Sequence, residues 1–285
     1  EHYGRKKLIE YLLTVQDSAT WVVGTHRMGK TSLLRQVEWS ILQGKNVTYV
    51  PLYWDIRACE SEEDLANALF SSINDEADRF RSFGIDQLSF HNADIIHSLQ
   101  YLQQALSKQG KQLLLLIDEA EALVTVARQN PIVLTRIRHS MQSGEFRTIM
   151  TATKNLIQLN DLMRKTISAP FLSGFRLVNL WKLDLESTQA MIIQQQNEYQ
   201  VEVSAKLIAE IIAHTNGHPY LTQFLCHRLF ETNGIDRSWL RDITAKDMQV
   251  DYLLAGFFQM DFDHLSPSEK QILLAVARHE VVNEE

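Results

Sequence analysis

A glycine-rich segment near the amino terminus carries the residues with the clearest chemical meaning. Residues 24–31 read Gly-Thr-His-Arg-Met-Gly-Lys-Thr and fit the phosphate-binding pattern G-x-x-x-x-G-K-[ST] without a mismatch. Glycines let backbone N–H groups turn toward phosphate oxygens, and the helix that follows adds the positive end of its dipole. In this pattern Lys30 reaches the β- and γ-phosphates and the Thr31 hydroxyl binds Mg²⁺. The predicted phosphate contacts are Gly24, Thr25, His26, Arg27, Met28, Gly29, Lys30, Thr31 and Ser32.

A pair of acidic residues follows the apolar run 113–117. At the carboxyl end of a buried strand, Asp118 would hold Mg²⁺ through water, and Glu119 would orient and deprotonate an attacking water. Such a pair alone would also suit a helix cap, but beside a complete phosphate loop the catalytic interpretation is favoured. We therefore predict Lys30, Asp118 and Glu119 as catalytic residues, with Thr31 and Asp118 at the metal. Two adjacent acids favour hydrolysis over phosphorylation of a substrate hydroxyl.

The elements that must position these residues alternate between strands and helices over the first 180 residues. Helical spacing of apolar residues predicts helices after Lys30, after a capping box that begins at Ser61, and over 94–107. Segment 81–93 lacks a clean period and is predicted to be a surface connection. Buried-type apolar runs predict strands at 20–24, 47–53, 112–117, 148–152 and 175–180. This alternation predicts an α/β fold with a parallel sheet covered by helices on both faces.

Beyond the fifth predicted strand the sequence carries helix signals only. Helix starts at Ser187, Ser204 and Pro219 predict an all-helical subdomain. Residues 266–269 form a capping box with proline at the first helical position, which predicts a further helix. The predicted organisation is a nucleotide-binding α/β domain at 1–182, a helical lid at 183–257 and the start of another domain at 258–285.

Composition and charge exclude several classes of protein. The 285 residues are 45% hydrophobic and 22% charged, which is typical of globular proteins. The net charge, 28 minus 35 or −7, argues against a protein that coats nucleic acid. The longest apolar run has five residues, whereas a bilayer span needs about 20, so we expect no membrane contact. Isolated cysteines at Cys59 and Cys226 fit a reducing compartment, so we expect a cytoplasmic protein, excised from a longer chain.

Taken together, these features resemble the additional-strand catalytic-glutamate branch of phosphate-loop NTPases, and within it the AAA+ and STAND (signal-transduction ATPase) groups. Tyr3, Gly4 and Arg5 look like the hydrophobic-Gly-Arg motif that lines the adenine in these groups. The sequence departs from that motif at Lys6, where an acid is usual. The resemblance therefore implies an adenine contact from the amino-terminal segment.

Two further segments match the same groups. Thr153 and Lys154 lie where these proteins keep a polar or basic sensor of the γ-phosphate, and the motif does not separate the two. Residues 215–221 resemble the G-x-P motif of the helical lid, whose proline packs against base and ribose. The resemblance implies nucleotide contacts from His218 and Pro219, although His218 also suits a plain helix-start position.

The function that the resemblance implies is a nucleotide-controlled switch. ATP or ADP with Mg²⁺ would bridge the sheet and the lid, hydrolysis would be slow, and the closed form would self-associate head to tail. Sensor and effector domains would lie outside this chain. Residues 266–277 are similar to the first helix of a winged-helix domain, so a DNA-associated AAA+ ATPase of the origin-recognition or helicase-loader type is the alternative. A catalytically inactive scaffold is a third interpretation.

Other conspicuous residues leave alternatives open. Arg136 and Arg138 lie in the basic stretch 128–165 and are either arginine fingers for a neighbouring subunit or ordinary surface arginines. That stretch and the acidic region after residue 200 are either solvated faces or subunit contacts. His214 and His218 are four residues apart, but Gly217 interrupts the helix that a metal pair would need. Core packing, not base stacking, is favoured for Tyr49, Tyr53 and Trp54.

Overall fold

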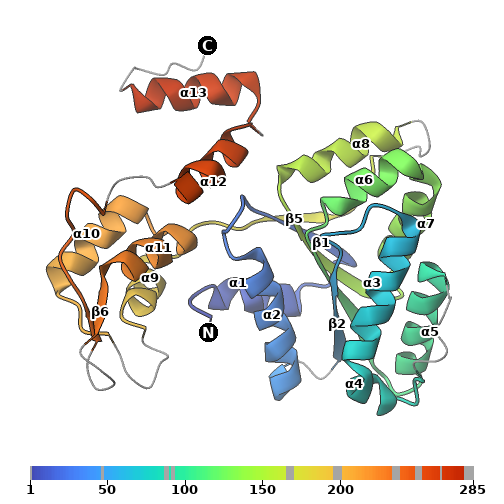
Figure 1. Cartoon of the computed structure of the whole chain (residues 1–285). Helices are drawn as coiled ribbons and strands as arrows, with labels where there is room; N and C mark the ends of the chain where they lie inside the picture. The colour runs from blue at the N-terminus through green and yellow to red at the C-terminus, as the bar shows by residue number, and fades with distance from the viewer. Residues whose placement is uncertain are drawn as a thin grey trace.

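A parallel sheet forms the centre of the first half of the chain. The computed structural model describes residues 2–45, 48–86, 90, 94–164, 170–194, 201–232, 238–247, 252–263 and 265–278. Its five strands are β1 Ala19–Val23, β2 Tyr49–Asp55, β3 Gln112–Asp118, β4 Arg147–Ala152 and β5 Arg176–Asn179. Their order is β2-β3-β4-β1-β5, so β4 lies between β1 and β3 as the additional strand. The sheet and the helices around it fill the right half of Figure 1. The predicted fold class is confirmed, while Val47, the predicted start of the second strand, lies outside the described residues.

Helices cover both faces of this sheet, and together they form the α/β domain. On one face α1 (Lys6–Thr14) and α2 (Lys30–Ser40) pack on Leu114 and Leu116 of β3. The intervening side chains, such as Leu115, face the opposite core. That core is covered by α3 Glu62–Asp75, α5 Ile95–Ser107, α6 Ala122–Gln129, α7 Pro131–Gln142 and α8 Gln158–Met163. Burial on both faces explains why β3 is an unbroken apolar run.

Short elements connect the larger ones. They are the π-helical turn η1 Ile41–Lys45, α4 Ala77–Arg81 and the 3₁₀ turn η3 Lys154–Ile157. The capping box before α3 is present as predicted, because Ser61 Oγ accepts from Asp64 N and Asp64 Oδ2 accepts from Ser61 N. In the predicted surface connection 81–93, Ile85 and Phe90 are buried in the core, which corrects that prediction. Residues 87–89 and 91–93 lie outside the described part.

A second packing unit, the helical subdomain, comprises the described residues between Leu185 and Leu240. Its helices are α9 Leu185–Ile192, α10 Ala205–Thr215 and α11 Pro219–Leu229, and their apolar faces share a core. It also holds an antiparallel pair, β6 (Phe230–Thr232) and β7 (Ser238–Leu240), so the all-helical prediction is wrong there. Strands of three residues are too short to leave a pattern in the sequence.

The start of α9 also differs from the prediction. Its N-cap is Asp184, whose Oδ1 accepts from the backbone N–H of Ser187 at 2.7 Å. Both residue types are favoured N-caps, so the sequence alone does not separate them. The predicted caps of the next two helices are confirmed, because Ser204 precedes α10 and Pro219 is the first residue of α11.

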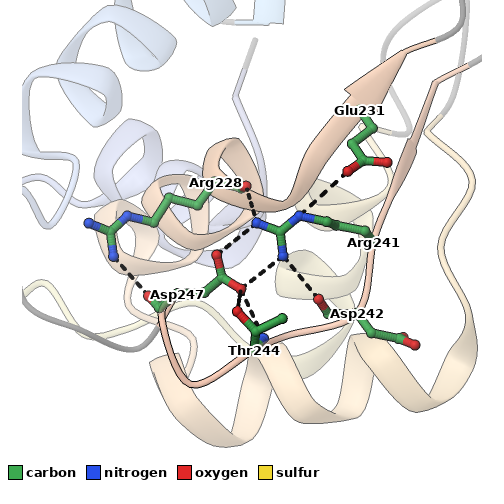
Figure 2. Close-up of polar contacts among 6 residues, drawn as sticks. All are labelled: Arg228, Glu231, Arg241, Asp242, Thr244 and Asp247. Carbon is green, nitrogen blue, oxygen red and sulfur yellow. Dashed lines mark hydrogen bonds and ion pairs between the residues drawn. The ribbon is translucent and has the colours of Figure 1, made fainter.

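An ionic cluster fixes the chain after β7 (Figure 2). The Arg241 guanidinium pairs with both carboxylate oxygens of Asp247 at 2.8 Å and donates to the backbone oxygen of Arg228. Thr244 Oγ1 donates to the same carboxylate at 2.6 Å. These contacts hold the pKa of Asp247 far below its usual range, with the Arg241 hydrogen bonds as the largest cause. The cluster ties the segment that follows β7 to α11.

Two helices end the described chain, α12 (Tyr252–Asp263) and α13 (Pro267–Ala277). The capping box of Ser266 and Glu269 is present at the start of α13. Glu269 also bonds across the molecule, because Lys154 Nζ lies 2.6 Å from each of its carboxylate oxygens. The predicted boundary between residues 257 and 258 falls inside α12. In the described part of the chain, no helix combines the length and apolar character needed to cross a membrane.

Candidate functional site

The glycine-rich loop connects β1 to α2. Gly29 has a φ of 85° and is the N-cap of α2, a left-handed conformation that favours glycine. Lys30 is buried, and its Nζ donates to the backbone oxygens of Gly24 at 3.3 Å and Thr25 at 3.1 Å. The loop therefore wraps around the Lys30 side chain. Its ammonium group lies inside the loop, where the phosphate-binding pattern predicts the phosphates.

Asp118 is the centre of a hydrogen-bond cluster at the carboxyl end of β3. It is completely buried. Its Oδ2 accepts from Thr31 Oγ1 at 2.6 Å and from Tyr53 OH at 2.7 Å. Its Oδ1 accepts from Thr151 Oγ1 at 2.5 Å and from the backbone N–H of Glu119 at 3.1 Å. Four donors fix this carboxylate, and burial together with the bond to Asp118 raises the pKa of Tyr53.

The next residue, Glu119, has a φ of 56°, a region that residues other than glycine rarely occupy. Burial raises the pKa of the Glu119 carboxyl, and the positive charge of Lys30 opposes that rise. Nearby in the chain, Glu121 Oε1 accepts from the backbone N–H of Thr153, while Glu121 Oε2 is buried and has no hydrogen-bond partner within the described part of the chain. A strained backbone, such as the positive φ of Glu119, is common at active sites.

A cavity of about 620 Å³ collects residues from three parts of the chain, and its size suits a small-molecule ligand. The predicted residues that line it are Tyr3, Arg5, His26, Arg27, Met28, Gly29, Lys30, Thr31, Ser32, Glu119 and Pro219. Asp118 lies directly behind Thr31. The amino-terminal segment, the phosphate loop and the helical subdomain therefore meet at one place, as the resemblance implies.

The amino-terminal segment is held by close contacts. Arg5 Nη2 donates to the backbone oxygen of Met28 at 2.5 Å, and burial lowers the pKa of Arg5 to about 10. Gly4 does not line the 620 Å³ cavity. It has a φ of 75°, and a Cβ atom there would lie 2.5 Å from Ser187 Oγ. Gly4 therefore allows this segment to pack against α9.

Several predicted contacts lie elsewhere. Gly24, Thr25, Thr153, Lys154 and His218 line a second cavity of about 890 Å³ instead of the first. Thr153 Oγ1 accepts from the backbone N–H of Asn155 and starts η3, and Lys154 is paired with Glu269. The structure therefore does not bring either sensor candidate to the cavity that Glu119 lines.

His218 is the N-cap of α11, with its Nδ1 accepting from the backbone N–H of Leu221 at 3.4 Å. This is the helix-start role that the sequence left open. Burial lowers the pKa of His218. The adjacent Pro219 does line the 620 Å³ cavity, so the motif reaches the site through its proline.

The two arginine-finger candidates are engaged within the α/β domain. Arg136 Nη2 pairs with Asp94 Oδ2 at 2.6 Å, and Arg138 Nε donates to the backbone oxygen of Phe171 at 2.9 Å. Sequence reasoning missed Arg57, which lines the 620 Å³ cavity two residues beyond β2. Its place after a predicted strand was the available signal, because carboxyl ends of parallel strands share one edge of the sheet.

Other residues of the 620 Å³ cavity were also missed by sequence reasoning. They are His2, Leu183, Met191, Tyr220, Gln223 and Asp261. The ring of Tyr220 lies 4.1 Å from the Arg27 guanidinium carbon, which connects the phosphate loop to α11. Tyr220 belongs to the segment that resembles the G-x-P motif. That motif predicted a nucleotide contact from this segment, but not from the Tyr220 side chain.

Comparison with known proteins identifies the family. Residues 14–159, just over half of the 285, match the family model described as an AAA domain. The chain belongs to the AAA domain family. A comparison with curated protein sequences finds no match.

Solved structures share the fold of this AAA-family chain. The Walker-type ATPase PabY2304 of Pyrococcus abyssi has a TM-score of 0.61 at 19% identity, over 78% of this chain and 66% of that one. The ORC2 protein of Aeropyrum pernix, solved as ADPNP–ADP complexes, has a TM-score of 0.57 at 14% identity, over 93% and 72%. The ORC1 protein of the same organism, in complex with DNA, has a TM-score of 0.51 at 16% identity, over 98% and 72%. Likeness at these identities establishes the fold alone.

Proposed function

We propose that this AAA-family chain binds Mg-ATP, hydrolyses it slowly and acts as a nucleotide-controlled switch of the STAND type. One observation carries the proposal: Lys30, Thr31 and Glu119 line a single cavity, together with Arg5 from the amino-terminal segment and Pro219 from the helical subdomain. Phosphate-binding, water-activating and lid groups therefore converge on one volume.

Nucleotide binding follows from the loop. Its backbone N–H groups and the start of α2 attract phosphate oxygens, and Lys30 Nζ exchanges the carbonyls of Gly24 and Thr25 for those oxygens. Thr31 Oγ1 and the Asp118 carboxylate, 2.6 Å apart, fit the hydroxyl and carboxylate positions of an Mg²⁺ site. When bound, Mg²⁺ neutralises charge on the phosphates.

Hydrolysis is assigned to Glu119. Its carboxylate lines the cavity beside Lys30 and accepts a proton from the attacking water as the water's oxygen approaches the γ-phosphorus. Asp118 does not suit this role, because it is completely buried and does not line the cavity. The two adjacent acids thus have different roles: Asp118 contributes to the Mg²⁺ site, and Glu119 is the general base.

The switch follows from the walls of the cavity. Leu183, Pro219 and Tyr220 belong to the helical subdomain or the connection to it, while Lys30 belongs to the α/β domain. A bound nucleotide touches both the α/β domain and the helical subdomain. In this proposal, ATP and ADP therefore hold the two parts in different closed arrangements. We propose that the ATP form self-associates head to tail, with sensor and effector domains elsewhere in the full protein.

The first test identifies nucleotide in the purified protein. We expect denaturation to release about one ADP per chain, identified by chromatography, from a monomer. Lys30→Ala should release none, whereas Lys154→Ala is a matched control that removes a lysine paired with Glu269 outside the 620 Å³ cavity. A wild-type protein that neither carries nor binds nucleotide would refute the proposal.

The alternative is a DNA-associated AAA+ ATPase, in which α13 is the first helix of a winged-helix domain. Its support is the fold shared with the ORC1 protein that was solved with DNA. Binding of the full-length protein to labelled duplex at two salt concentrations separates the two functions. A DNA-binding protein must lose affinity steeply as salt rises, because phosphate contacts release counterions.

A further inference from the structure

We propose that Arg57 is a catalytic residue, and that its guanidinium neutralises charge on the transferred phosphoryl group within the same chain. The inference rests on the proposed ATP hydrolysis. It assigns to a residue of this chain the role that the sequence offered to Arg136 or Arg138 of a neighbouring subunit.

The topology brings Arg57 to the reacting edge of the sheet. In the β2–β3 ladder Asp55 is opposite Asp118. The following residue, Ile56, donates its backbone N–H to the backbone oxygen of Asp118 at 3.3 Å. Arg57 therefore leaves the sheet directly beside the strand end that carries Asp118 and Glu119.

The side chain of Arg57 faces the cavity and is available to a ligand. It lines the 620 Å³ cavity together with Lys30, Thr31 and Glu119. The side chain is 63% exposed, and its ion pair is with Asp55 at 4.0 Å. Exposed pairs of this length contribute little, so an anion can recruit the guanidinium at small cost.

Two other arginines that line the cavity, Arg5 and Arg27, have their guanidinium groups in contact with other parts of the protein. Arg5 is bonded to the Met28 oxygen, and the Arg27 guanidinium lies on the ring of Tyr220. Arg57 differs from both because it emerges from the β2 end, next to Glu119. It is therefore the arginine placed to meet the phosphate that the Glu119 water attacks.

The reaction is hydrolysis of the terminal phosphoanhydride. A bond forms between the water oxygen and the γ-phosphorus, and the bond from that phosphorus to the β–γ bridging oxygen breaks. The water proton passes to Glu119 and then to solvent, so ATP and water give ADP, phosphate and a proton. Negative charge grows on the departing and equatorial oxygens, and a fixed guanidinium stabilises it.

The decisive variant is Arg57→Ala, studied in the full chain. An arginine in this role is worth about 10³ or more in rate, so single-turnover hydrolysis should fall about 10³-fold while ATP affinity stays within about threefold. Arg57→Lys should recover part of the rate, and Arg136→Ala should hydrolyse at the wild-type rate. Wild-type hydrolysis by Arg57→Ala overturns the inference but leaves the proposed function intact, whereas a wild-type chain without ATP hydrolysis defeats both.

A mixing experiment separates action within a chain from action between chains. Glu119→Gln keeps Arg57, and Arg57→Ala keeps Glu119, so the two variants complement each other only if the arginine acts on a neighbour. We expect the mixture to stay inactive and the wild-type rate per chain to be independent of protein concentration. Recovery of hydrolysis in the mixture would show that Arg57 works in a partner's site and would overturn action within the chain.

Discussion

Arg147, the first residue of β4, is a buried arginine with few contacts for its charge. This environment allows a prediction about the stability of the protein. Arg147 is 2% exposed, and its three guanidinium nitrogens have no hydrogen-bond partner among the residues that the structure describes. The guanidinium carbon lies 5.4 Å from the centre of the Tyr49 ring, a weak cation–π contact. A buried charge with this little support lowers the free energy of unfolding.

Replacement of Arg147 by methionine keeps the buried apolar stem and removes the charge. A buried polar group without a partner costs about 1–3 kcal/mol, and the cation–π contact that is lost offsets about 0.5–1 kcal/mol of this. We therefore expect Arg147→Met to stabilise the protein by about 0.5–2 kcal/mol. For a protein of this size each kcal/mol raises Tm by about 2–4 °C.

Thermal and urea unfolding, followed by circular dichroism, measure the effect. The matched control is Arg79→Met, because Arg79 is 15% exposed but donates to the Pro51 oxygen at 2.6 Å and pairs with Glu38 and Glu76. Its removal takes one of two arginine partners from the buried Glu38 carboxylate and removes the guanidinium donor from the Pro51 oxygen, so the control should lose about 1–3 kcal/mol. A Tm for Arg147→Met at or below that of the wild type would refute the reasoning.

Three further predictions concern other residues. Tyr53→Phe removes one donor to Asp118, so the Mg²⁺ concentration for half-maximal hydrolysis should rise about tenfold in a metal titration, and an unchanged titration contradicts this. Gly4→Ala places a Cβ against Ser187 at a positive φ and should cost about 1–3 kcal/mol in urea unfolding, whereas an unchanged midpoint would show that the segment moves freely. Burial raises the pKa of Cys226 to about 12, so its thiolate is scarce at pH 8; mass spectrometry should find it alkylated only after unfolding, and rapid labelling of the native protein would disagree.

The parts of the molecule that the sequence predicted are those that local patterns determine. The phosphate loop is contiguous, and β3 is apolar on both faces, so each leaves a complete signal in a short window. The capping boxes at Ser61 and Ser266 were found for the same reason. Such features need only a few neighbouring residues to form.

The rest depends on contacts between distant parts of the chain. Lys154 pairs with Glu269 across 115 positions of the chain, a contact that no local pattern in the sequence indicates. Arg57 reaches the site because β2 lies beside β3, an order that alternation of strands and helices does not specify. The bonds from Tyr53 and Thr151 to Asp118 arise in the same way, from strands on either side of β3.

Asp261, in α12, lines both the 620 Å³ cavity and the 890 Å³ cavity, so one helix forms part of the wall of each. A molecule in the first cavity that prefers one position of α12 changes the shape of the second. The coupling free energy is the same in both directions, whichever cavity is filled first. A ligand that fills either cavity and prefers one position of α12 therefore changes the affinity of the other cavity by the same factor.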